Sequence, residues 1–348
     1  MSRLIGVGTA VPAAAYTQPE LLALFGFRDR ITKRVFAAPH IAKRHLLLPP
    51  VDPATGRLAY ETQARLNEKF RRGSLELGGA AIRKALARAR IAPSELGALV
   101  CVTTTGWAVP GLSALLAYEL ALPADLFRLD LVGMGCNAGL NGLAALDGWI
   151  RAGAGRKGLL LCCEINSAIY FAEDSARDGL VNGIFGDGAA ALVVAGDAPP
   201  AHGPRLVDFA HHLIPEERDA MRFDWDEPAQ RWRFFLSRDI PEVLGEAVAR
   251  PVGRLLSAHG RTTSDVRHWV LHTGGGTVID AIRRRLGLSE ADVRHSRSVL
   301  RDFGNVSSGS FLFSFERLLE ERTPREGDLG VMITMGPGAQ IEAALLTW

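Results

Sequence analysis

The chain has 348 residues, of which 47% are apolar and 22% are charged, and its 40 basic and 38 acidic residues leave a formal net charge of +2. The length suits two domains or one large one, and the composition argues against a disordered or coiled-coil chain. A net charge this close to zero gives no extended positive potential of the kind that nucleic-acid binding needs. We therefore do not expect nucleic acid as a partner.

Predicted strands and helices alternate along the chain. Glycines and Pro12 interrupt the apolar N-terminal segment, which therefore predicts a strand rather than a signal peptide. Apolar patterning predicts an amphipathic helix over 75–90, buried strands at 99–105, 158–164, 189–195 and 269–272, and helices at 140–151 and 310–321. This alternation is typical of layered α/β folds. No apolar run reaches the ~18 residues of a membrane helix, so we expect no membrane partner.

The cysteine content indicates a reduced, cytoplasmic protein. The four cysteines are Cys101, Cys136, Cys162 and Cys163, and no pair of them has the C-x-x-C spacing of a structural zinc site. We therefore expect no metal.

A weak internal repeat suggests that the chain contains two copies of one α/β unit. Residues 94–106 resemble 264–276, and residues 133–139 resemble 303–309, both at an offset of 170 residues. Two matches in register predict a duplication. We place the two halves at 1–200 and 201–348, divided within a segment rich in proline and glycine.

Three residues in these repeats have side chains suited to nucleophilic catalysis. Cys136 precedes a predicted helix, whose N-terminus stabilises a thiolate. His272 ends a predicted buried strand, and Asn305 lies in a glycine turn. Each alone has an ordinary structural interpretation: packing for the cysteine, a hydrogen bond for the histidine and a turn for the asparagine. The repeat predicts that they converge on one edge, with an imidazolium lowering the pKa of the Cys136 thiol.

Five motifs in order resemble those of type III polyketide synthases, the chalcone synthase group with the thiolase fold. The matching strings are GCNAG at 135–139, FGDGA at 185–189, HTGG at 272–275, FGNVSS at 303–308 and, with Thr334 in place of the first glycine, TMGPG at 334–338. This resemblance covers essentially the whole chain. It implies an α/β thiolase fold in which the duplicated unit gives a five-layered αβαβα architecture.

The resemblance also implies roles for individual residues. Cys136 would carry the acyl chain, while His272 and Asn305 would bind the thioester carbonyl of malonyl-CoA and stabilise its enolate. The remaining cavity residues would be two gatekeepers, a wall residue and a residue that reaches into the partner subunit of a homodimer: Phe185, Phe234, Ser307 and Val109. For the two phenylalanines, ordinary core packing is the alternative.

Coenzyme A thioesters would be substrates, and no cofactor is implied. The phosphates of coenzyme A need cations, which the resemblance places at Arg34 and Lys33, with 43–44 completing a local basic cluster. Ile31 and Ala38 stand where the family has lysines. A solvated basic helix face is the alternative interpretation.

More particular stretches, at 104–113, 219–225, 298–304, 309–317 and 336–342, resemble a bacterial branch of the family. That branch would use malonyl-CoA as both starter and extender, joining four units into a C8 chain that cyclises to an aromatic product, with pathway partners of the crotonase type. The alternatives are another starter or product of pyrone, resorcinol or naphthalene type, an enzyme like ketoacyl-ACP synthase III, and an inactive subunit that binds coenzyme A.

Overall fold

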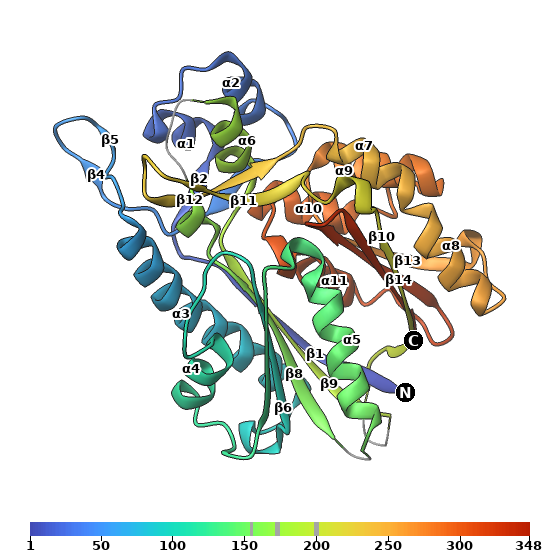
Figure 1. Cartoon of the computed structure of the whole chain (residues 1–348). Coiled ribbons are helices and arrows are strands. Elements are labelled where there is room, and N and C mark those ends of the chain that lie inside the picture. Colours follow the sequence, from blue (N-terminus) through green and yellow to red (C-terminus); the bar gives the residue numbers. More distant parts are fainter. Residues whose placement is uncertain (154–155, 171–174, 198–201) are drawn as a thin grey trace.

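The computed structural model describes residues 1–348 except 154–155, 171–174 and 198–201 (Figure 1). Its strands are β1 Ser2–Ala10, β2 Ala15–Thr17, β3 Lys43–His45, β4 Val51–Asp52, β5 Arg57–Leu58, β6 Ala98–Thr103, β7 Phe127–Val132, β8 Lys157–Glu164, β9 Gly188–Gly196, β10 Arg205–Leu213, β11 Met221–Asp226, β12 Arg231–Leu236, β13 Val266–Leu271, β14 Leu329–Gly336 and β15 Gln340–Thr347. Its helices are α1 Gln18–Phe25, α2 Arg30–Phe36, α3 Gln63–Ala89, α4 Leu112–Glu119, α5 Ala138–Arg151, α6 Ala176–Ile184, α7 Ile240–Ala247, α8 Ala249–Ala258, α9 Gly276–Leu286, α10 Arg294–Phe303 and α11 Ser310–Glu321.

The elements stack in the predicted αβαβα order. Within the described residues, nine strands join in the order β13-β14-β15-β10-β1-β9-β8-β6-β7. Helices α5 and α11 lie between the two ends of this sheet, since α5 contacts both β8 and β14 and α11 contacts both β9 and β13 (Figure 1). Helix α3 covers the outer face of β1, β8 and β9, and α8 covers that of β10 and β15. The predicted thiolase-type layering is thus present.

Side-chain alternation along the buried strands separates the cores between these layers. In β8, Leu159 and Leu161 belong to the core under α3, whereas Leu160 and Cys162 belong to the central core around α5 and α11. Successive strand residues point to opposite faces, so a strand covered on both sides is apolar throughout. This explains the continuous apolar runs in the sequence.

The internal repeat corresponds to repeated structure. A 3-10 turn at Pro93–Glu95 leads into β6, and one at Thr263–Asp265 leads into β13. Likewise, turns at Gly135–Asn137 and Ser307–Gly309 lead into the two central helices, α5 and α11. The chosen division between the halves falls at 198–201, outside the described residues, and stays a prediction.

Element types agree with the predictions more closely than element ends do. The strand expected to reach residue 105 ends at Thr103, because the backbone N–H groups of Thr104 and Thr105 turn to the carboxylate of Glu164. The helix expected from residue 75 begins at Gln63, where the Thr62 side chain caps it. Within the described ranges, no helix combines the length and apolar character that a membrane crossing requires.

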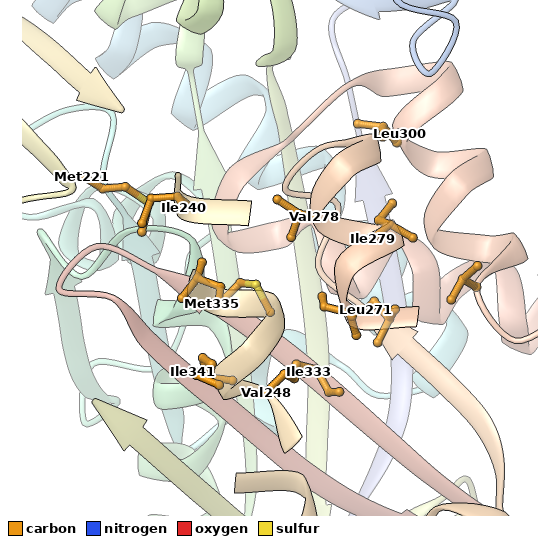
Figure 2. Close-up of a cluster of buried hydrophobic side chains, with 14 of the residues drawn as sticks. Met221, Ile240, Val248, Leu271, Val278, Ile279, Leu300, Ile333, Met335 and Ile341 are labelled. Atoms are coloured by element: carbon orange, nitrogen blue, oxygen red, sulfur yellow. The ribbon is translucent and has the colours of Figure 1, made fainter. Parts of the chain in front are cut away.

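The outer core of the C-terminal half forms part of a cavity wall. Figure 2 shows buried side chains of this core converging from β11, α7, α9, β14 and β15. Four of them, Met221, Ile240, Val278 and Met335, also line a cavity. One wall of that cavity is therefore as rigid as the core behind it.

Candidate active site

Cys136 lies in the tight turn at Gly135–Asn137 that opens α5, as predicted. Gly135 has φ +74°, and a Cβ there would lie 2.1 Å from Cδ of Pro337. Only glycine meets both demands without strain. The turn therefore holds Cys136 between α5 and the loop after β14.

The Cys136 thiol has two neighbours that stabilise its thiolate, and burial opposes them. Its Sγ lies 3.4 Å from Oγ of Ser307. Burial raises the pKa of the Cys136 thiol to about 12, which hydrogen bonds from Ser307 and Asn305 oppose and the negative charge of Glu164 reinforces. The net shift is upward, contrary to the predicted lowering by an imidazolium.

His272 directly follows β13 and is 2% exposed. Its backbone N–H donates to the carbonyl of Ile333 at 2.8 Å, and its ring Nδ1 is hydrogen-bonded to Oγ of Ser310. Burial lowers the pKa of His272 to about 3, so the imidazole is neutral. This direction runs against the predicted imidazolium, because a low-dielectric surrounding disfavours a charged ring.

Asn305 is held in one amide orientation. Its backbone N–H donates to the carbonyl of Ile184 at 2.8 Å, and its carbonyl accepts the N–H of Gly186 at 3.0 Å. Its side-chain Oδ1 accepts the backbone N–H of Ser307 at 2.8 Å. The side-chain Nδ2 is thus left as a hydrogen-bond donor beside the thiol.

The three reactive residues line one cavity of about 290 Å³, together with Phe185 and Phe234. The two phenylalanine rings meet edge to face, with centroids 6.0 Å apart. Phe234 also lines a second, larger cavity of about 820 Å³, which extends past Asn137 and Thr104. Phe234 thus lies where the two cavities meet, and Phe185 packs against it from the smaller cavity.

Other predicted site residues lie apart from these three. In the described chain, Val109 lines neither cavity and is 81% exposed. Lys33 and Arg34 are exposed on α2, where the next residue, Val35, lines the first cavity. Ser307, in contrast, is 4% exposed and contacts the thiol.

Arg44, which the sequence placed in the basic cluster, is fully buried. Its guanidinium donates to the backbone carbonyls of Asn182 and Phe185, at 2.6 and 2.7 Å, and to Oη of Tyr170 at 2.9 Å. Its inclusion among cations exposed to coenzyme A was therefore wrong, because the guanidinium is buried and donates to oxygens inside the protein. Arg44 instead anchors the segment that carries Phe185.

Sequence reasoning missed Glu164, which ends β8 and is fully buried. Its carboxylate accepts from the backbone N–H of Thr104 at 2.9 Å and from the hydroxyls of Ser308 and, at 3.4 Å, Ser307. Burial raises the pKa of this carboxyl, and these donors lower it. The sequence pattern that could have revealed this residue is a glutamate at the end of an otherwise apolar strand.

Comparisons with known proteins agree with this geometry. Residues 54–199 match the family model "Chalcone and stilbene synthases, N-terminal domain", and residues 206–347 match the corresponding C-terminal domain. The 3,5-dihydroxyphenylacetyl-CoA synthase of Streptomyces toyocaensis is 48% identical over 99% of this chain and 90% of its own. That of Amycolatopsis orientalis is 48% identical over 100% of this chain and 94% of its own.

Solved structures support the same assignment. The crystal structure of 1,3,6,8-tetrahydroxynaphthalene synthase from Streptomyces coelicolor, a bacterial type III polyketide synthase, superposes with a TM-score of 0.91 at 26% identity over 99% of both chains. An algal polyketide synthase from Ectocarpus siliculosus superposes with a TM-score of 0.90 at 25% identity, over 99% of this chain and 98% of its own. The chain therefore belongs to the chalcone and stilbene synthase family of type III polyketide synthases.

Proposed function

We propose that this enzyme condenses four molecules of malonyl-CoA into 3,5-dihydroxyphenylacetyl-CoA. The observation that carries the proposal is the 48% identity, over 99% of this chain, to the synthase of that product from S. toyocaensis. The naphthalene-forming relative from Streptomyces peucetius is only 29% identical. This difference favours the C8 product over a naphthalene type.

In the first step Cys136 takes up the starter. Its sulfur attacks the thioester carbonyl carbon of malonyl-CoA, and the bond from that carbon to the coenzyme A sulfur breaks. The thiol proton leaves on the departing sulfur, while His272, which lines the same cavity, donates a hydrogen bond to the carbonyl oxygen as negative charge develops there. The products of this step are an acyl-enzyme and free coenzyme A.

In the second step His272 and Asn305 stabilise an enolate. The Nδ2–H of Asn305 and the Nε2–H of His272 donate to the thioester oxygen of a second malonyl-CoA while its carboxylate leaves as CO₂. The bonding electrons pass into the enolate, whose carbon attacks the carbonyl carbon of the acyl group on Cys136. The bond from that carbon to the Cys136 sulfur then breaks, which leaves the lengthened chain on coenzyme A, and the thiol takes it up again as in the first step. Neutral donors fixed in a buried cavity suit this developing charge.

Repetition lengthens the chain, and the larger cavity offers room for it. Three extensions followed by loss of the starter carboxylate give a C8 chain, which closes by an aldol reaction and loses water to become aromatic. The 820 Å³ cavity beyond Phe234 supports this placement, since the 290 Å³ cavity is small for a tetraketide.

Mass spectrometry of products from malonyl-CoA alone tests the proposal. We expect 3,5-dihydroxyphenylacetyl-CoA without an acyl carrier protein, and no gain from added acyl-CoA starters. A pyrone, resorcinol or naphthalene product would overturn the product assignment while leaving the condensation intact. A strict need for an acyl carrier protein would favour a ketoacyl-ACP synthase III-like enzyme.

Arg34 and Lys33 are proposed to bind the phosphates of coenzyme A. Support comes from their exposure on α2, beside the cavity residue Val35. Double replacement by glutamate should raise the KM for malonyl-CoA and leave kcat largely unchanged, because exposed phosphate contacts act mainly on ground-state binding.

A homodimer is proposed in which Val109 reaches the cavity of the partner subunit. Support comes from a group of exposed apolar side chains on the loop before α4, on α4 and on β7: Trp107, Val109, Tyr118 and Val132. Light scattering should give twice the chain mass of 37.5 kDa, and Val109→Asp should shift the particle toward the monomer.

The cellular location and the pathway partners are proposed from the family resemblance alone. We propose that the reaction takes place in the cytoplasm and that crotonase-type enzymes act with this synthase on its thioester product. Adding such an enzyme to the malonyl-CoA incubation should raise the yield of released product, and an unchanged yield would count against the partnership.

A further inference from the structure

Ser310, the first residue of α11, is placed to control the catalytic histidine from behind. It is fully buried, and its Oγ lies 2.5 Å from Nδ1 of His272. The other ring nitrogen, Nε2, faces the chain at Gly274, where a Cβ would lie 3.3 Å away. Gly274 lines the 290 Å³ cavity. Ser310 and the cavity therefore contact opposite edges of one imidazole.

The direction of the Ser310 hydrogen bond follows from its other partner. Its Oγ accepts the backbone N–H of Thr273 at 3.2 Å. Among the described residues, the acceptor that the Ser310 hydroxyl proton can reach is Nδ1 of His272, so Ser310 donates to Nδ1. Since the buried imidazole is neutral, it carries one proton, and an Nδ1 that accepts from Ser310 leaves that proton on Nε2.

We propose that Ser310 is a positioning residue that selects the Nε2–H form of His272, so that the ring presents a donor to the thioester oxygen. The inference rests on the role proposed above for His272. Because Nε2 already carries a proton in this form, a second proton enters the ring at Nδ1, and the Ser310 hydroxyl then turns to accept from it. A rotatable hydroxyl thus serves both protonation states, which a fixed carbonyl or carboxylate acceptor does not.

Ser314 provides a matched control for Ser310. It lies one turn further along α11, is equally buried, and its hydroxyl donates to the carbonyls of Leu271 and Ser310. Ser314→Ala therefore removes a buried hydroxyl from the same helix without touching the imidazole. Ser310→Cys keeps the volume of the side chain but replaces the hydroxyl with a weak hydrogen-bonding group.

Nitrogen-15 NMR of the histidine rings tests the tautomer independently of activity. In the unmodified enzyme and in Ser314→Ala, His272 should show a protonated Nε2 and an unprotonated Nδ1. In Ser310→Ala and Ser310→Cys the two forms should mix. An Nε2–H form that persists undiminished in both Ser310 variants would overturn the proposal.

Decarboxylation kinetics provide the second readout. With Cys136→Ala as the background, the kcat for CO₂ release from malonyl-CoA should fall roughly 5- to 150-fold in Ser310→Ala, with little change in KM. Ser314→Ala should stay near the background rate. Equal rates in the two serine variants would overturn the role of Ser310. If His272→Ala also left decarboxylation unchanged, the proposed function itself would be wrong.

Discussion

Oδ1 of Asn305 accepts the backbone N–H of Ser307 at 2.8 Å, and this contact determines which end of the amide remains free to donate. Ser307 has φ +50°, a left-handed conformation that brings its N–H back toward residue 305. The same residue places its hydroxyl 3.4 Å from the sulfur of Cys136. One turn therefore orients the enolate donor and contacts the nucleophile.

Asn305→Asp tests this donor while retaining the acceptor. The carboxylate can still accept from Ser307, but it presents a negative oxygen where Nδ2–H was. We expect decarboxylation of malonyl-CoA to fall about 10²- to 10³-fold, because an oxyanion donor is lost. Release of CO₂ measures this, alongside a thermal melt to show that the fold is retained. Decarboxylation within twofold of normal would remove Asn305 from the reaction.

Gly135→Ala tests the nucleophile turn. The left-handed φ and the contact with Pro337 should displace Cys136, and a shift of 1 Å is enough to lower product formation about 100-fold. Gly148→Ala, in α5, is the control, since a Cβ there meets nothing within 4 Å, and it should leave activity unchanged. Comparable activity in the two variants would contradict the role given to the turn.

His272 should make the fold sensitive to acid. Its folded-state pKa of about 3 lies below the unfolded value, so the contribution of the buried neutral ring is complete above about pH 6.5 and declines as the pH falls. Relative to His272→Gln, the enzyme should lose about 2 kcal/mol of unfolding free energy between pH 6.5 and 5. Urea denaturation of both proteins measures the difference. A constant difference would show that the ring is charged in the folded state.

Glu164→Gln should make the thiol more acidic. The negative charge of Glu164 raises the pKa of Cys136, so its removal should increase the thiolate fraction and the rate of alkylation by iodoacetamide at pH 9, by about tenfold for each pKa unit. Thr103→Val, which removes a 3.4 Å contact to Glu164 but keeps the charge, is the control and should alkylate at the original rate. A slower reaction in Glu164→Gln would reverse the sign assigned to this charge.

The sequence predicted the layered fold and the cavity triad because both leave local patterns. Continuous apolar runs predict strands covered on both faces, and glycine turns mark Cys136 and Asn305. Residues that act through long-range contacts leave no such pattern. Arg44 looked like a surface cation, and Glu164 and Ser310 looked ordinary, because their partners lie far away in the chain. The protonation states of Cys136 and His272 also depend on burial, which residue types alone do not reveal.

The central claim is that Cys136 carries the growing chain while His272 and Asn305 generate the enolate. Rapid quenching after mixing with malonyl-CoA, followed by peptide mass spectrometry, tests it most directly. We expect an acyl adduct on the peptide containing Cys136. In Cys136→Ala we expect neither adduct nor polyketide, although CO₂ release continues. Polyketide formation by Cys136→Ala, or an adduct on another residue, would contradict the account.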